Sequence, residues 1–208
     1  MDWQVWALFA VTEAALCFSP GPAVLLVVSQ GLARGTLASV WSNLGILAGN
    51  TFYFALSATG LGALLLASYE LFSAIRWLGA AYLIWLGVAA FRGRSRVLSV
   101  APAVGTPQAA GRMFLNGVVL QVANPKALVF FTALLPQFID PRGSVLAQVT
   151  ILAVTSVVIE FAVLLAYGAA AGRMTTLAAR PRFGTVANRV AGSMLITAGL
   201  GMATLRRP

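Results

Sequence analysis

Six long apolar segments, separated by short polar connections, constrain the fold of this chain more than any other feature. They cover roughly residues 3–28, 37–67, 71–91, 113–138, 145–171 and 189–205. About 20 apolar residues in a helix cross the hydrocarbon core of a bilayer. Of the 208 residues, 60% are hydrophobic and 9% are charged, whereas a soluble domain carries about 25% charged residues. The sequence predicts an all-α integral membrane protein with six transmembrane helices.

Arginine is distributed unevenly between the connections. Nine of the 13 arginines lie in the first, third and fifth connections, and the other side holds Arg76, Arg142, Arg206 and Arg207. Cytoplasmic loops are enriched in Lys and Arg, which predicts that the odd connections, including the linker 92–112, are cytoplasmic and that both termini face outward. Because the net charge of +9 lies mostly in these short loops, it indicates topology rather than a nucleic-acid partner. No basic residue precedes Arg34, so we expect the first segment to be retained rather than cleaved as a signal peptide.

The segment 113–138 is interrupted near its middle by Asn124-Pro125-Lys126. Pro125 has no N–H, so a helix through it leaves the carbonyl of Gln121 without its usual donor, which is costly in lipid unless another group supplies one. Lys126 falls near mid-membrane, where an ionisable residue is by default a candidate for function. The simpler alternative is a kinked helix whose lysine extends to the membrane interface.

A second break lies in the first segment, at Ser19-Pro20-Gly21-Pro22. The two prolines remove two backbone donors and free the carbonyls of Leu16 and Phe18, so a continuous helix is not expected. The sequence predicts an unwound stretch whose half-helix ends can face an anion with their N–H groups and a cation with their carbonyls. The alternative is that two unrelated kinks occur in one chain.

The two halves of the chain, residues 1–91 and 113–208, share a plan of three spans with the break in the first. Because three is odd, the second half enters the membrane from the opposite side, which is the inverted-repeat arrangement of many secondary transporters. The chain is predicted to form one membrane domain in which the two breaks meet near the midplane and bind a zwitterion such as an amino acid. The predicted substrate-binding residues are Ser19, Pro20, Gly21, Pro22, Asn50, Gln121, Asn124, Pro125 and Lys126.

Two acidic residues also lie within apolar segments. Glu13 is about two helical turns before the first break, and Glu160 is in the middle of the fifth segment. Burying a charge in a membrane is costly, so each carboxyl group is a candidate proton carrier, or a partner of Lys126 for which substrate and proton compete. The alternative is a structural role, with Glu13 near an interface and Glu160 hydrogen-bonded across helices.

Other chemistries lack their usual residues. The chain has no histidine and one cysteine, so zinc sites and Ser-His-Asp or Cys-His catalysis are not expected, and no metal or cofactor is predicted. Cys17 lies in an apolar setting and is interpreted as a small packing residue. Two alternatives to transport remain, namely a hydrolase that pairs Ser19 with Lys126 and a structural membrane protein that moves no solute.

Several short motifs resemble the lysine exporter family. They are Pro20-Gly21-Pro22, Gly45-xxx-Gly49, Phe114-Leu115-Asn116-Gly117, Asn124-Pro125-Lys126 and Leu135-Pro136-Gln137-Phe138. The resemblance extends over essentially the whole chain and is strongest to the branch that exports threonine, homoserine and other neutral amino acids. It implies a six-span exporter of amino acids or their derivatives in the bacterial inner membrane, driven by the proton gradient and dimeric.

Overall fold

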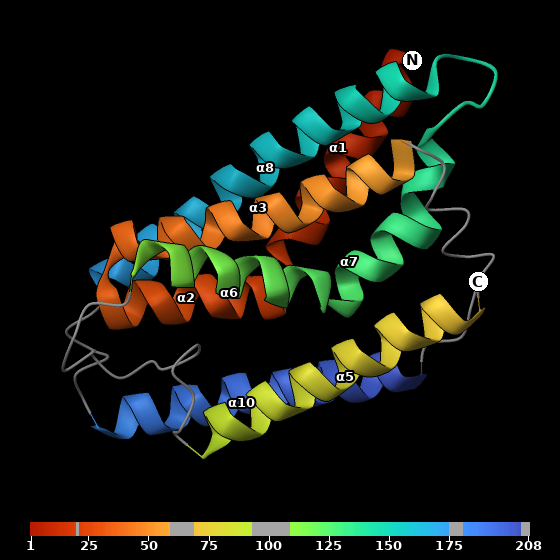
Figure 1. Ribbon diagram of the computed structural model, residues 1–208. Helices are drawn as coiled ribbons and strands as arrows, with labels where there is room; N and C mark the ends of the chain where they lie inside the picture. The colour runs from red at the N-terminus through yellow and green to blue at the C-terminus, as the bar shows by residue number, and fades with distance from the viewer. Residues whose placement is uncertain (20, 59–68, 93–108, 175–180, 205–208) are drawn as a thin grey trace.

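The chain folds into helices packed along one long axis (Figure 1). The computed structural model describes residues 1–19, 21–58, 69–92, 109–174 and 181–204, and within these ranges it contains no strand. The elements are α1 (Trp3–Phe18), α2 (Pro22–Arg34), α3 (Thr36–Ala58), α5 (Tyr69–Phe91), α6 (Ala110–Val122), α7 (Pro125–Val129), the π-helical turn η1 (Phe130–Leu134), the 3-10 turn η2 (Leu135–Phe138), α8 (Val145–Arg173) and α10 (Pro181–Thr204).

Local signals in the sequence explain most helix ends. α1 begins after Asp2, whose side chain accepts a hydrogen bond from the N–H of Gln4, and α8 begins after Ser144, whose hydroxyl also accepts a backbone N–H. α2 and α7 both begin with a proline, whose missing N–H is harmless in a first turn. α10 begins at Pro181 rather than at the predicted residue 189. The predicted span began only at residue 189 because the residues before it include charged ones. Arginine is nevertheless a good helix former, so the helix starts earlier than the apolar segment.

Both proline motifs interrupt their helices. α1 and α2 meet at 53° around Ser19 and Gly21, and α6 meets the segment 125–138 at 51°. The second of these is also irregular beyond the break, because Pro136 has no N–H to continue an α-helical ladder. By length and composition, α8 alone among the described helices can cross a membrane, and the number rises to three if each bent pair is one span. The arrangement of six spans therefore stays a prediction.

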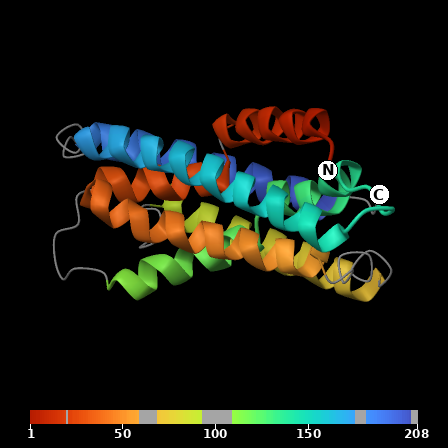
Figure 2. The same ribbon diagram turned by 90° about the horizontal axis from the view of Figure 1, so that it is seen from above.

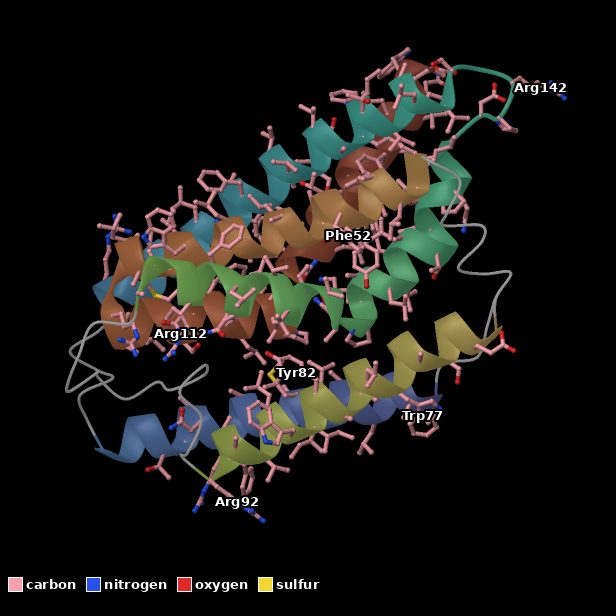
Figure 3. The ribbon with its side chains drawn as sticks, viewed as in Figure 1. Phe52, Trp77, Tyr82, Arg92, Arg112 and Arg142 are labelled. Atoms are coloured by element: carbon pink, nitrogen blue, oxygen red, sulfur yellow. The ribbon has the colours of Figure 1, made fainter. Side chains whose placement is uncertain are left out.

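Successive passes of the chain run in alternating directions (Figure 1). α6 and the turns after it start from the end of the bundle opposite to the start of α1, so the second half begins where the first half's α5 finishes. α5 and α10 pack chiefly on each other, as a pair beside the layer that contains α2, α3, α6 and α8 (Figures 1 and 2). Arg92 and Arg112 lie toward one end of the bundle and Arg142 at the other (Figure 3).

The outer faces of the helices are apolar. Large hydrophobic side chains are exposed on several elements, for example Leu37, Leu78, Trp85, Leu146 and Val158. Trp77 likewise points away from the body of the protein (Figure 3). Soluble monomers rarely expose apolar surface on this scale, so the surface suits a hydrocarbon environment.

Glycines set the closest helix contacts. A β-carbon added to Gly45 of α3 would fall on the carbonyl oxygen of Phe114 in α6, and one added to Gly117 would fall on the carbonyl oxygen of Ser42. α5 and α10 show the same relation, since a β-carbon on Gly87 would lie 2.8 Å from the Gly192 oxygen. Helices in lipid associate through such close backbone packing, and this positions α3 and α6 around the centre of the protein.

Gly45→Ala is expected to destabilise the protein by about 1–3 kcal/mol, because the new methyl group meets backbone that cannot rotate away. The matched control is Gly111→Ala on α6, where an added β-carbon meets nothing within 4 Å. That variant is expected to be neutral or stabilised by up to about 1 kcal/mol, since alanine is the better helix former. Unfolding of both proteins in detergent, followed by circular dichroism, measures the difference. Equal stability of the two variants would contradict the packing described.

Candidate functional site

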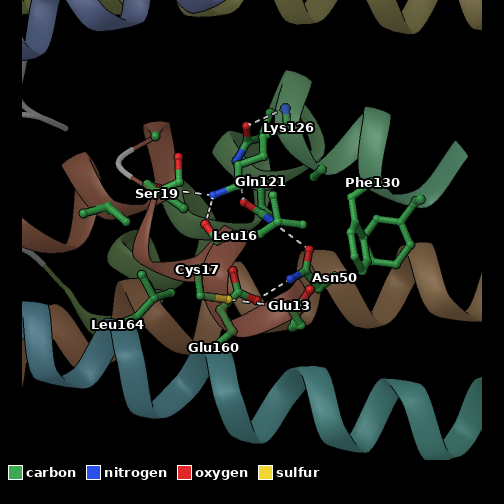
Figure 4. A pocket seen from close by; sticks show the side chains of 16 residues that line it. Glu13, Leu16, Cys17, Ser19, Asn50, Gln121, Lys126, Phe130, Glu160 and Leu164 are labelled. Carbon is green, nitrogen blue, oxygen red and sulfur yellow. Dashed lines mark hydrogen bonds between the residues drawn. The ribbon is translucent and has the colours of Figure 1, made fainter. Parts of the chain in front are cut away.

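The two helix breaks meet at a polar pocket in the centre of the protein (Figure 4). The pocket has a cavity volume of about 50 Å³. Because a water molecule occupies about 30 Å³ in the liquid, the pocket in this conformation admits one or two waters and no amino acid. Eight of the predicted site residues line it, namely Glu13, Ser19, Gly21, Asn50, Gln121, Asn124, Lys126 and Glu160.

A chain of buried side-chain amides runs from the second break to α8. Asn124 Nδ2 donates to Gln121 Oε1 at 3.1 Å, and Gln121 Nε2 donates to Asn50 Oδ1 at 2.6 Å. Asn50 Nδ2 in turn donates to the carboxylate of Glu160. At the other end, Asn124 Oδ1 accepts the backbone N–H of Lys126 at 3.1 Å and so caps α7. Each of these three amide groups donates to the next group in the chain, and the last one donates to Glu160. The chain of hydrogen bonds therefore links the Glu160 carboxylate to the start of the helix that carries Lys126.

The second carboxyl group, that of Glu13, lies in the same pocket and is contacted by two neutral side chains. Ser156 Oγ donates to Glu13 Oε1 at 2.6 Å, and the Cys17 Sγ lies 3.8 Å from the same oxygen. Glu13 is 5% exposed and Glu160 8% exposed. Gaining or losing a proton changes what each carboxyl group can accept and donate, so both are placed to alter these contacts. Within the described ranges, no group of three or more Cys, Asp or Glu residues could hold a metal ion.

Lys126 points into the protein and stabilises the first break. Its ammonium group donates to the carbonyl oxygen of Leu16 and, at 3.1 Å, to that of Ser19 (Figure 4). The carbonyl of Leu16 is one of the two that the prolines of the first break were predicted to free. An ammonium group has three donors, so a third N–H remains for another acceptor. This geometry disfavours the alternative in which the lysine extends to the membrane interface.

At each break, one tyrosine hydroxyl donates a hydrogen bond to the carbonyl of the last helical residue before the break. Tyr167 Oη of α8 donates to the carbonyl of Phe18, the last residue of α1, at 3.1 Å. Tyr53 Oη of α3 donates to the carbonyl of Val122, the last residue of α6, at 2.7 Å. In each case the tyrosine comes from the other half of the chain. The two breaks are therefore supported by equivalent, reciprocal contacts.

Tyr53→Phe and Tyr167→Phe are each expected to lower the free energy of unfolding by about 1 kcal/mol, because each leaves one carbonyl without its donor. Tyr82→Phe on α5 is the control, since the Tyr82 hydroxyl makes no hydrogen bond to the described residues. Thermal unfolding in detergent compares the three variants. Loss of stability in the control equal to that in the other two would show that the hydroxyl contacts are not the cause.

A second, larger cavity of about 440 Å³ lies on the other side of Lys126. One wall consists of Gly21, Pro22, Leu25, Pro125 and Lys126, and the other consists of Ser193, Met194, Thr197 and Ala198 of α10. Its volume is within the range of about 300–1,000 Å³ found for small-molecule sites. Gly21 and Lys126 line both cavities, so they form the partition between them.

The structure places the predicted site residues around these two cavities, except for Pro20, which lies outside the described residues. Their roles in binding and proton transfer stay predictions. Sequence reasoning missed Ser156, Tyr53, Tyr167 and the cavity wall on α10. Ser156 is one helical turn from Glu160, and Cys17, interpreted as a packing residue, is one turn from Glu13 and lines the central pocket. That spacing of four residues is a signal that could have identified both.

Interrupted helices that meet at a central site lined by polar side chains are found in many secondary transporters. The chain belongs to the LysE type translocator family, whose model matches residues 14–206. A membrane protein of Vibrio cholerae serotype O1, described as uncharacterized, is 34% identical over 206 residues, which is 99% of this chain and 100% of that protein. A homoserine/homoserine lactone efflux protein of Salmonella typhimurium is 32% identical over 99% of both chains. A leucine efflux protein of Salmonella choleraesuis is 27% identical over 90% of this chain and 89% of its own. No solved structure matches the chain.

Proposed function

We propose that the protein is a proton-coupled exporter of neutral amino acids or small amino-acid derivatives. The observation that carries the proposal is the central pocket, where one lysine and two buried carboxyl groups meet at two interrupted helices. Intramembrane charges are costly and mark substrate and proton pathways. The efflux names of relatives in the same family support export, and those names refer to homoserine and leucine.

The proposed architecture is one membrane domain of six spans in the bacterial inner membrane. Residues 1–91 and 113–208 form two inverted three-helix repeats, the linker 92–112 is cytoplasmic, both termini face outward, and the protein acts as a homodimer. Three observations support the repeats: the alternating helix directions, the similar bends at the two breaks, and the reciprocal contacts of Tyr53 and Tyr167.

The proposed mechanism is alternating access around the two breaks. The substrate carboxylate takes the third N–H of the Lys126 ammonium, and the freed backbone groups near Gly21 and Asn124 bind the rest of the zwitterion. Because the central pocket is too small for an amino acid, substrate entry requires the contacts of Lys126 with Leu16 and Ser19 to open. Glu13 and Glu160 carry the proton that exchanges with substrate.

The alternative of a Ser-Lys hydrolase has weaker support. Lys126 contacts Ser19 through the backbone carbonyl oxygen, which accepts a hydrogen bond and is not a nucleophile. A structural protein that moves no solute would leave the two buried carboxyl groups and the lysine without a role. Both alternatives also lack the support of the efflux proteins in the family.

The test is a counterflow screen of the common amino acids with the purified protein in proteoliposomes, with and without an imposed pH gradient. Exchange of at least one neutral amino acid, and its accumulation against a concentration gradient when the pH gradient is imposed, are expected. If no amino acid exchanges under either condition, the proposed function is wrong. If amino acids exchange but the pH gradient has no effect, the proposal of export stands and the proposal of proton coupling is wrong.

A further inference from the structure

The cavity between the helix breaks and α10 differs from the central pocket in size and in chemistry. At about 440 Å³ it can hold an amino-acid side chain, whereas the central pocket of about 50 Å³ cannot. Both acidic residues, Glu13 and Glu160, line the central pocket and neither lines the larger cavity. Lys126, on the partition, is the one charged residue among the described residues that line the larger cavity.

The wall on α10 is apolar with two hydroxyl groups. Met194 and Ala198 supply apolar surface, together with Leu25 of α2, and Ser193 and Thr197 supply the hydroxyls. Such a wall suits aliphatic, thioether and hydroxyl-bearing groups. A second ammonium group placed here would meet the charge of Lys126, and none of the described residues that line this cavity is a carboxylate that could pair with it.

We propose that this cavity is the side-chain subsite of the transporter and that Met194, Thr197 and Ala198 of α10 determine its specificity. The inference rests on the proposed function, because it assumes that the substrate's charged groups bind at the helix breaks beside it. The subsite accepts neutral side chains up to the size of leucine or methionine and rejects cationic ones. α10 thereby acquires a role that no motif in the sequence indicated.

The first test changes the volume of the cavity in both directions. Ala198→Phe fills it and is expected to lower counterflow of leucine relative to serine by about tenfold or more, since apolar pockets discriminate methylene-sized differences by that factor. Met194→Ala enlarges the cavity and is expected to shift the same ratio the other way. The control is Ala81→Phe, the same substitution at an exposed position of α5 that lines neither cavity.

The second test uses the unmodified protein and compares leucine with lysine. Counterflow of lysine is expected to be slower by about tenfold or more, because like charges brought together without compensation are strongly disfavoured. Equal rates for the two amino acids would overturn the proposed rejection of cations.

The outcomes separate the subsite from the function on which it rests. If the unmodified protein exchanges neutral amino acids but both cavity variants keep its leucine-to-serine ratio, the subsite is wrong and export stands. If Ala198→Phe does not fold, the ratio in Met194→Ala decides alone. If the unmodified protein exchanges no amino acid, the proposed function fails and the subsite fails with it.

Discussion

Replacing Lys126 with methionine is expected to lower counterflow by about 100-fold, which corresponds to about 2.7 kcal/mol of lost charge-assisted hydrogen bonding. The ammonium group is shared between the carbonyls of Leu16 and Ser19 and, in the proposed mechanism, the substrate carboxylate. Methionine has a similar length but no donor, so the carbonyls at the first break lose a donor from α7 and the bound anion loses its partner. Radiotracer exchange in proteoliposomes, normalised to the amount of reconstituted protein, measures the loss.

Two further variants separate charge from structure. Lys126→Gln keeps an N–H donor for the carbonyl oxygens but has no charge, and it is also expected to lose transport while folding more stably than the methionine variant. Arg142→Met removes one positive charge from an exposed position and is expected to transport normally. Full activity of the glutamine variant would show that Lys126 acts through the helix break alone and does not bind the substrate carboxylate.

Glu160→Gln is expected to abolish accumulation driven by a pH gradient while preserving exchange. A gradient of one pH unit supports about tenfold accumulation for each proton exchanged, and a transporter without its proton carrier cannot use it. Glutamine keeps an oxygen that can accept from Asn50, so the chain of amides to Gln121 and Asn124 stays intact. The measurement compares counterflow with gradient-driven uptake in the same vesicles.

Other ionisable groups face the same pocket, so the comparison includes them. Glu13 and Lys126 both line it with Glu160, and Cys17 lies beside Glu13. If Glu13→Gln loses gradient-driven uptake and Glu160→Gln keeps it, the proton carrier is Glu13. Glu70→Gln, at an exposed position at the start of α5, is the matched control and is expected to retain both activities.

The centre of the protein is closed in this structure. The pocket between the breaks is smaller than an amino acid, and the contacts of Lys126 across it join α1 to α7. The larger cavity on the α10 side is big enough for a substrate side chain. In the proposed transport cycle, breaking the Lys126 contacts joins the two cavities, and the substrate carboxylate replaces the carbonyl oxygens as the partner of the lysine.

The sequence by itself determined the properties that depend on neighbouring residues. Helical structure follows from long apolar segments, and the interruptions at Pro22 and Pro125 follow from the missing N–H of proline. The sequence alone also shows that one lysine and two acidic residues lie inside apolar segments. Each is a candidate for function, because an ionisable side chain is costly anywhere in a membrane. The family resemblance of the short motifs is confirmed by the match to the LysE type translocator family.

Only the tertiary structure decided which distant side chains reach the freed carbonyls, although the Leu16 carbonyl also accepts the nearby N–H of Ser19. Lys126 reaches Leu16 across 110 positions of the chain, and Tyr167 reaches Phe18 across 149. The tertiary structure also divides the predicted site residues between two cavities and places α10 against the larger one. These relations depend on how distant helices pack, and that packing is set by close glycine contacts such as Gly45 with Phe114. Hydropathy and proline positions carry no information about such distances, because they describe each helix alone.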